Sequence, residues 1–288
     1  MVTLVFGGTG KVGSVAVKHL VDKGRTVRVF THSPGKLSAL PSNVEAAQGD
    51  LDNPDTIPSA FADVDEMILI LAVNPNEQAR GLAVVEAAKA AGVKRMVFLS
   101  LVHGPGTEKV PFYQSKLAIE AAFKESSMEW AVIRSSSFFQ SDAGLKSEIF
   151  NKGVFSAPIG SMGVNRIDTR DVGYAVAEAM TKEPFETGEF RVFGPDSLTG
   201  ESSAATYAKL LGKPVRYGGD DLDEWAAFKE GAFPPWSLNA LRHMYGAVQK
   251  TGMKPEDGEQ KSSLLPEKLI SFERFARELV STGTITVK

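Results

Sequence analysis

The chain of 288 residues contains no cysteine, only four histidines and no long hydrophobic run. The absence of cysteine excludes disulfides, thiolate nucleophiles and cysteine–zinc sites, and it fits a reducing compartment. The histidines are scattered along the chain, so the sequence predicts no metal site built from protein side chains. No apolar segment approaches the roughly 20 residues of a membrane-spanning helix, so we expect no membrane anchor.

A strong net charge is missing as well. The formal net charge of −3 gives no reason to expect nucleic acid or an anionic membrane as a partner. The first residues already form an apolar strand, which leaves no room for a signal peptide and points to a cytoplasmic protein. With 43% hydrophobic and 23% charged residues, we expect a soluble globular protein, as a monomer or a homodimer, with a small molecule as its partner.

The most specific feature that is present is the segment 7–13, Gly-Gly-Thr-Gly-Lys-Val-Gly, which directly follows an apolar run. Gly8, Gly10 and Gly13 fit the G-x-G-x-x-G fingerprint, and Gly7 begins an overlapping G-x-x-G-x-x-G. These glycines allow a sharp turn, close approach of a pyrophosphate to the backbone, and tight packing of the next helix. The positive end of that helix then faces the phosphates. We therefore expect a dinucleotide cofactor at this turn.

Strand and helix patterns alternate regularly through the first half of the chain. The predicted strands cover residues 2–6, 26–30, 44–48, 66–73, 94–100 and 129–133. One predicted helix begins at Gly13 and is ended by Gly24, and the others cover 54–62, 78–91 and 111–126. This alternation predicts an α/β Rossmann fold with a doubly wound parallel sheet and a ligand at the carboxyl ends of its strands. We predict a Rossmann domain over 1–150, to which parts of 165–195 return. A smaller mixed α/β substrate lobe over 151–288 then ends in a helix over 266–280.

The residues after the second strand bear on the choice of cofactor. An acidic residue at this point would bind the ribose 2′-hydroxyl of NADH and repel the 2′-phosphate of NADPH. The chain has His32 and Lys36 instead, so we predict NADPH rather than NADH; the alternative is a solvated loop whose charges face water. After the third strand, Asp50 and Leu51 are expected beside the adenine ring, unless Asp50 only ends the strand.

The carboxyl ends of the central strands place Ala72, Asn74 and Ser100 in the predicted crevice. Lys116 lies near it, on the apolar stripe of the helix over 111–126, where an unpaired ammonium is costly to bury. Two explanations stay open. Lys116 reaches the ribose hydroxyls of the cofactor and adds positive charge near the reacting centre, or its stem covers apolar surface while its amine lies in water.

Several segments resemble the atypical short-chain dehydrogenase/reductase family and, within it, the NmrA-like branch of quinone, azo and related NADPH oxidoreductases. They are residues 7–13, 49–51, 91–95, 115–116, 130–140, 168–172 and 271–275. The resemblance implies that Gly7, Thr9, Gly10, Lys11 and Val12 hold the pyrophosphate and that His32 occupies a place where arginine is common. We also predict Ser100, Lys116 and Ser135 as cofactor-binding residues, with Ser100 and Lys116 lining the nicotinamide ribose. Arg134-Ser135 departs from the Arg-Pro that often follows this strand in the family.

The chain departs from the wider family at its catalytic Tyr-x-x-x-Lys pair, because Phe112 stands four residues before Lys116. Tyr113, three residues before Lys116, is the remaining candidate acid, although it falls with Leu117 and Glu120 on a wetter helix stripe. Without the usual acid, direct hydride delivery to a ready acceptor is favoured, since solvent can protonate the product.

We therefore predict an NADPH-dependent oxidoreductase that acts on a small, flat or aromatic acceptor such as a quinone or an azo compound. The candidate catalytic residues are Lys116, Ser100 and Tyr113. Aromatic residues within 222–250 are predicted mainly as core of the smaller lobe, although some of them face the nicotinamide in an alternative reading. The alternative function is a non-catalytic NADP(H) sensor of the NmrA type, which the missing tyrosine favours; an epimerase or dehydratase of nucleotide sugars needs that tyrosine.

Overall fold

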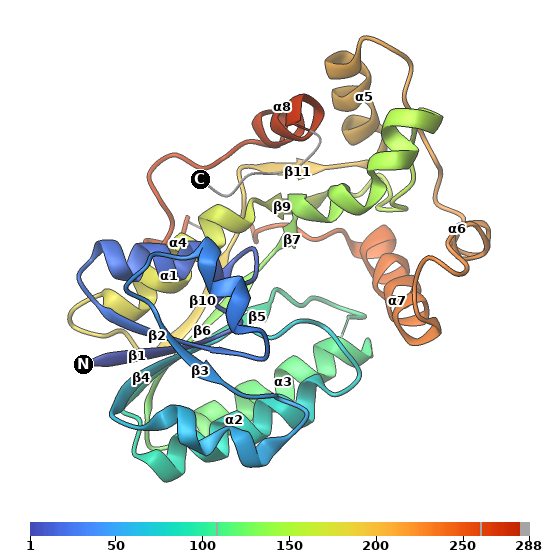
Figure 1. Ribbon diagram of the computed structural model, residues 1–288. Helices are drawn as coiled ribbons and strands as arrows, with labels where there is room; N and C mark the ends of the chain where they lie inside the picture. Colours follow the sequence, from blue (N-terminus) through green and yellow to red (C-terminus); the bar gives the residue numbers. More distant parts are fainter. Residues whose placement is uncertain (108, 260, 283–288) are drawn as a thin grey trace.

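The computed structural model describes residues 1–107, 109–259 and 261–282, and its centre is a seven-stranded parallel sheet (Figure 1). The strands stand in the order β10-β6-β5-β4-β1-β2-β3. Their bounds are β1 Val2–Phe6, β2 Thr26–Thr31, β3 Glu45–Gln48, β4 Val64–Leu69, β5 Arg95–Leu101, β6 Glu129–Ser135 and β10 Gly188–Val192. Starting from β1, the chain adds β2 and β3 on one side of the sheet, and it then adds β4, β5 and β6 on the other side of β1. The direction of winding therefore switches between β1 and β4. The predicted doubly wound Rossmann-type fold is confirmed.

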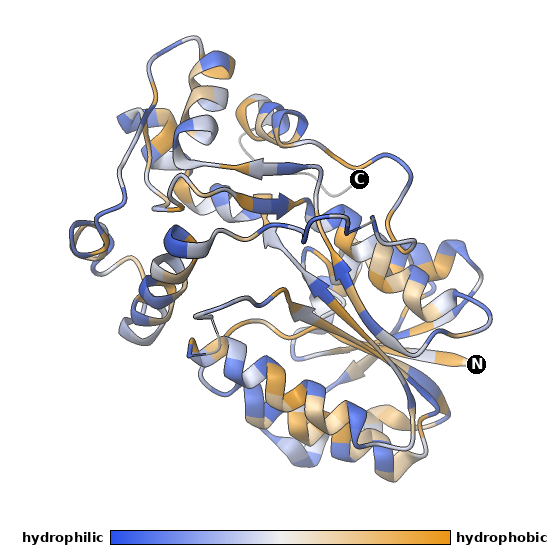
Figure 2. Cartoon of the chain, turned by 180° about the vertical axis from the view of Figure 1, so that it is seen from behind, coloured by the Kyte–Doolittle hydropathy of each residue, from blue (hydrophilic) through white to orange (hydrophobic). Residues whose placement is uncertain are grey.

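Helices cover both faces of this sheet (Figure 1). They are α1 Gly13–Asp22 and α4 Thr169–Thr181 on one face, and α2 Glu77–Ala91 and α3 Pro111–Lys124 on the other. Val5 and Ile68 pack toward α1 and α4, whereas Phe6 and Leu69 pack toward α2 and α3. The central strands are therefore apolar on both sides, and Figure 2 shows hydrophobic colours in the middle of the sheet. Within the described ranges, no helix combines the length and apolar character needed to cross a bilayer.

A second group of elements, here called the smaller lobe, lies at the carboxyl ends of the sheet strands. It contains β7 Ser137–Phe138, β8 Val154–Phe155, β9 Val164–Ile167, β11 Asp196–Leu198, β12 Arg216–Tyr217, α5 Gly200–Leu211, α6 Leu222–Phe228, α7 Pro235–Thr251 and α8 Phe272–Thr282. The strands form two small sheets, β11-β9-β7 and β12-β8. Buried aromatic rings, including Phe139, Phe155, Tyr207 and Phe272, fill its core. The elements α4 and β10 fall between lobe strands in sequence but pack with the large sheet. The domain boundary at residue 150 stays a prediction.

Three of the predicted elements differ from the structure by more than two residues at one end or in type. The helix expected over residues 54–62 is two 3-10 turns, Pro54–Thr56 and Pro58–Phe61, because each proline lacks the backbone donor that a continuous helix needs. The strand expected over 66–73 ends at Leu69. The C-terminal helix begins at Phe272 instead of residue 266.

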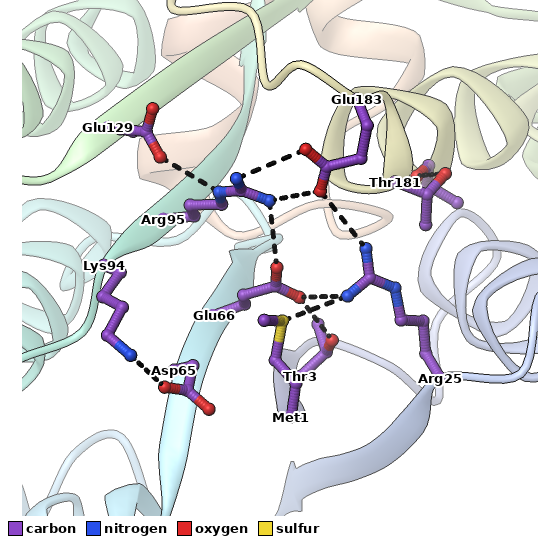
Figure 3. A network of polar contacts seen from close by, with 11 residues as sticks. Met1, Thr3, Arg25, Asp65, Glu66, Lys94, Arg95, Glu129, Thr181 and Glu183 are labelled. Carbon is purple, nitrogen blue, oxygen red and sulfur yellow. Dashed lines mark hydrogen bonds and ion pairs between the residues drawn. The ribbon is translucent and has the colours of Figure 1, made fainter.

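A buried carboxylate joins several elements at the amino ends of the strands (Figure 3). Glu66 in β4 is 1% exposed and accepts a hydrogen bond of 3.1 Å from the Thr3 hydroxyl of β1. Its oxygens lie 3.4 Å from Arg25 and 3.6 Å from Arg95. Arg95 also pairs at 2.6 Å with Glu183. This cluster fastens the end of the sheet that lies opposite the smaller lobe.

Replacing Glu66 by Ala should lower the free energy of unfolding by about 2–3 kcal/mol, since two arginines and a buried hydroxyl lose their common partner. Urea unfolding measures the change. Glu183→Ala is the control: this carboxylate is 57% exposed, so its loss should cost clearly less than the loss of Glu66. Equal losses for the two variants would contradict the central role of Glu66.

Candidate functional site

The glycine turn between β1 and α1 lies where the winding of the sheet reverses. Gly7 has a φ of +76°, and a Cβ atom there would lie 2.3 Å from the carbonyl oxygen of Ile70. A Cβ atom on Gly13 would lie 2.1 Å from the carbonyl oxygen of Gly7. Both glycines are therefore required by the contact of backbone with backbone inside the fold, before any ligand is considered.

Gly10 differs from these two glycines because it is exposed, and a Cβ atom there would meet only the Gly7 carbonyl oxygen, at 3.2 Å. Lys11 beside it is exposed, Thr9 is half-buried and Val12 is buried. Among the described residues, no side chain caps the start of α1 and no acid lies in its first turn. The turn therefore offers open backbone and the positive end of a helix, which suit a diphosphate.

The residues predicted for the adenosine end follow strands next to the turn, since β1 pairs with β2 and β2 with β3. His32 and Lys36 are both exposed, so their side chains can approach a ligand. Asp50 and Leu51 are half-buried, and the Asp50 carboxylate accepts a hydrogen bond of 2.9 Å from the Asp52 N–H. The side chains of His32 and Lys36 thus lie at the predicted 2′-phosphate position, and their role in binding stays a prediction.

Three further predicted residues lie at the carboxyl ends of β4 and β6. Ala72 is exposed, and its carbonyl accepts a hydrogen bond of 2.7 Å from the Asn74 amide. The Asn74 oxygen accepts in turn from the Asn76 N–H at 2.9 Å. Ser135 is buried and donates to the Ser100 carbonyl at 3.4 Å. Because β4, β5 and β6 are neighbours in the sheet, these residues follow neighbouring strand ends, where the crevice is predicted.

Lys116 is buried beneath that crevice, so the explanation that its amine lies in water is wrong. Its ammonium lies 2.7 Å from a carboxylate oxygen of Glu77, and the two side chains are 5% and 0% exposed. It also donates to the carbonyl oxygens of Leu99 at 3.2 Å and Leu71 at 3.4 Å. The Phe98 ring lies 5.0 Å from the same nitrogen. Lys116 therefore connects α3 to α2 and to the ends of two strands, and its contact with cofactor ribose stays a prediction.

Burial shifts the pKa of both members of this pair. It raises the pKa of Glu77 and lowers the pKa of Lys116, while their mutual attraction opposes each shift. The sequence analysis did not single out Glu77. As the first residue of α2, it looks from sequence like an acid that only stabilises the helix N-terminus.

Ser100 and Tyr113 are both buried but face different surroundings. The Ser100 hydroxyl donates at 2.5 Å to Glu120, which pairs with Arg134, so it points toward α3. Tyr113 packs beside Phe112, with ring centroids 5.0 Å apart, and burial raises the pKa of its hydroxyl. The expectation that Tyr113 and Glu120 lie on a wetter stripe is wrong, because α7 packs against the start of α3 and covers Tyr113.

A cavity of about 490 Å³ lies between the carboxyl ends of the strands and the smaller lobe. Leu101 and Ser135 border it from the sheet. Its aromatic lining consists of Phe112, Tyr113, Phe138, Trp225, Phe233 and Tyr245. Three of these rings, Trp225, Phe233 and Tyr245, lie within 222–250, and Trp225 is also buried as part of the core. A small, apolar cavity with aromatic walls suits a flat organic ligand.

Charged groups at the cavity wall are paired with one another. Arg166 donates to Asp142 at 2.6 Å, and the Tyr207 hydroxyl donates to the same carboxylate at 2.9 Å. Lys229 pairs with Glu148 at 2.5 Å. In the part of the chain that the structure describes, no cluster of three His, Cys, Asp or Glu residues could hold a metal ion. The wall thus presents little unpaired charge to a ligand.

Comparison with known proteins gives a family match over almost the whole chain: the model of the NmrA-like family matches residues 2–276. The chain is 30% identical to an NAD(P)H azoreductase of Xenophilus azovorans, covering 84% of this chain and 85% of the relative. The NADPH complex of an Escherichia coli NADPH-dependent quinone oxidoreductase superposes with a TM-score of 0.86 at 21% identity, covering 97% and 100%. The NADP complex of NmrA, a negative transcriptional regulator, gives 0.80 at 19%, covering 98% and 96%.

Replacing Lys116 by Met should lower the free energy of unfolding by about 3 kcal/mol near neutral pH, because Glu77 is left buried without its cation. Without that cation, the pKa of Glu77 moves further above its usual 4.5. The folded state then holds a proton more tightly than the unfolded state, so the variant loses stability as pH rises from this value. Its deficit against the wild type should be larger at about pH 8 than at about pH 5, as measured by urea unfolding.

Lys124→Met on the same helix is the control. Lys124 is partly exposed, so its loss should cost less than about 1 kcal/mol. The double variant Lys116→Met/Glu77→Gln should recover part of the lost stability and lose the pH dependence. A deficit of Lys116→Met that is independent of pH would contradict the buried pair.

Proposed function

The chain belongs to the NmrA-like family, and we propose that it is an NADPH-dependent oxidoreductase that reduces a small aromatic acceptor such as a quinone or an azo compound. The observation that carries this proposal is the aromatic cavity at the carboxyl ends of the strands, on the edge of the sheet that also holds the glycine turn. The names of the azoreductase and quinone oxidoreductase relatives support an oxidoreductase.

The residues on this edge fit a dinucleotide. Gly7, Thr9, Gly10, Lys11 and Val12 would hold the pyrophosphate, with Gly10 leaving room for it at the open backbone. The exposed side chains of His32 and Lys36 would bind the 2′-phosphate. Asp50 and Leu51 would border the adenine, and Ala72, Asn74 and Ser135 the nicotinamide side. NADP(H) in the two structural neighbours supports NADPH as the cofactor. When bound, it supplies a hydride.

Lys116 and Ser100 would support the cofactor site through contacts buried beneath it. Their polar atoms are engaged by Glu77 and Glu120 under the crevice, so each stabilises the strand ends that the cofactor covers. Tyr113 lies at the cavity wall itself. A tyrosine hydroxyl is protonated at neutral pH, and burial raises the pKa of Tyr113 further, so it can donate a hydrogen bond to the acceptor. Reduction of a quinone to a hydroquinone takes one hydride and one proton, and solvent supplies that proton.

The second candidate function is a non-catalytic sensor that reports the state of NADP(H) to a partner protein. Phe112 favours it, because the usual proton donor is missing at this position. The likeness to NmrA, a transcriptional regulator, agrees with it. The cavity favours the enzyme, since a sensor of cofactor state needs no second ligand site beside the cofactor.

The purified protein should oxidise NADPH in the presence of a quinone or an azo dye, followed by the loss of absorbance of NADPH. Leu241→Trp should lower kcat/KM for the acceptor at least about tenfold while NADPH binding stays unchanged, because the indole fills the cavity that Leu241 lines. Asn239→Trp is the matched control, since Asn239 is exposed on the same helix and does not line this cavity. If the protein binds NADPH but neither quinones nor azo dyes cause its oxidation, the oxidoreductase is rejected and the sensor remains as the candidate function.

Replacing Gly10 by Ala should weaken NADPH binding about ten- to hundredfold in calorimetric titration, because the added methyl group occupies the surface that the pyrophosphate approaches. The temperature of unfolding should change little, since Gly10 is exposed. Gly188→Ala at the start of β10 is the control: its Cβ atom meets only the Phe190 ring, at an ordinary 3.6 Å. Unchanged NADPH affinity in Gly10→Ala would place the cofactor elsewhere.

A further inference from the structure

Ser136 carries a hydroxyl for which the protein provides no partner. The residue is 1% exposed and lines the cavity, and its oxygen has no hydrogen-bond partner among the described residues. Buried hydroxyls are nearly always hydrogen-bonded, because leaving one unpaired costs the hydration that it had in the unfolded chain. An unpaired hydroxyl in a cavity wall therefore points to a group that arrives with the ligand.

The neighbouring polar side chains are already engaged. Ser135 donates to the Ser100 carbonyl at 3.4 Å, and Ser137 contacts the sulfur of Met253 at 3.8 Å. The charged groups of the wall pair with one another, as described above. Ser136 is thus distinguished from the serines on either side by the free bonding capacity of its oxygen.

The backbone fixes Ser136 at the edge where the reaction would take place. It directly follows β6, and its N–H donates to the Val192 carbonyl of β10 at 3.0 Å. The residue therefore joins the large sheet to β7 of the smaller lobe, while rotation about its Cα–Cβ bond can turn the hydroxyl toward the cavity. Tyr113 brings a second hydroxyl to the same cavity.

We propose that Ser136 donates a hydrogen bond to an oxygen atom of the acceptor and thereby selects acceptors that carry a carbonyl oxygen, quinones above all. This inference rests on the proposed function and names its substrate class. In quinone reduction, the hydride and its electron pair pass from NADPH to the quinone, one proton from solvent completes the hydroquinone, and NADP⁺ is released. Negative charge develops on the quinone oxygen in this step, so a fixed donor stabilises it more than it stabilises the ground state.

Ser136→Ala should lower kcat/KM for a quinone about tenfold, as expected for the loss of one hydrogen bond. With a cationic triarylmethane dye it should change kcat/KM less than about twofold, because the central carbon takes the hydride and needs neither a proton nor a hydrogen bond. Ser136→Thr, which keeps the hydroxyl, should restore activity with the quinone. Ser161→Ala removes an exposed serine of the smaller lobe that does not line the cavity and should leave both acceptors unaffected.

The temperature of unfolding distinguishes a role in ligand binding from a structural role, because the two roles predict opposite effects of Ser136→Ala. If Ser136 serves the ligand, Ser136→Ala should leave the temperature of unfolding of the ligand-free protein unchanged or raise it, since no protein partner is lost. A fall in this temperature, or equal losses of activity with the quinone and the dye, would overturn the proposal. So would unchanged activity with both acceptors.

The proposed function can fail separately from this inference. Absence of NADPH oxidation by the wild type with either acceptor would reject the oxidoreductase. In that case, titration of a quinone into the protein saturated with NADP⁺ tests Ser136 alone. A Kd about tenfold weaker in Ser136→Ala supports the hydrogen bond, whereas an equal Kd or no binding to the wild type rejects it.

Discussion

The close contact of backbone with backbone at the glycine turn is the constraint on which the rest of the structure depends. Gly7 lies against the Ile70 carbonyl, and Gly13 lies against Gly7 itself, with no room for a side chain at either position. Gly173 of α4 approaches the Val12 carbonyl in the same way, since a Cβ atom there would lie 2.6 Å from it. These contacts bring β1, β4, α1 and α4 together, and they leave the Gly10 side of the turn open.

The polar groups of Lys116 and Ser100 lie below the strand ends, whereas the wall of the cavity is largely apolar. Lys116 is held by Glu77, and Ser100 by Glu120. Above them, aromatic rings from α3 and the smaller lobe enclose the cavity. A protein arranged in this way contributes to hydride transfer mainly by positioning two flat molecules, because the reactive hydride belongs to the cofactor. The buried ion pair keeps the strand ends in place without presenting its charge to the ligand.

The sequence was sufficient to predict the fold and the turn, because both depend on local patterns. The apolar periodicity and the spacing of Gly7, Gly10 and Gly13 are properties of short segments. The partner of Lys116 could not be predicted, since Glu77 lies on another helix and carries no distinguishing pattern of its own. The sequence pattern places Tyr113 on a wetter stripe because an amphipathic helix usually buries one face, whereas α7 covers a second face at the start of α3. Such contacts between distant segments decide which side chains reach the cavity.

The pairing of charges around the cavity bears directly on what it can select. Arg166 is neutralised by Asp142, and Lys229 by Glu148, so an anionic ligand would have to compete with carboxylates already in place. Apolar area and shape then provide most of the affinity for a flat molecule, but they discriminate weakly between ligands of similar size. Discrimination falls to the few polar atoms that lack protein partners, because a site built to bond an oxygen rejects a ligand without one more strongly than an apolar wall can. An unpaired hydroxyl such as that of Ser136 would therefore have more influence on selectivity than its small size suggests.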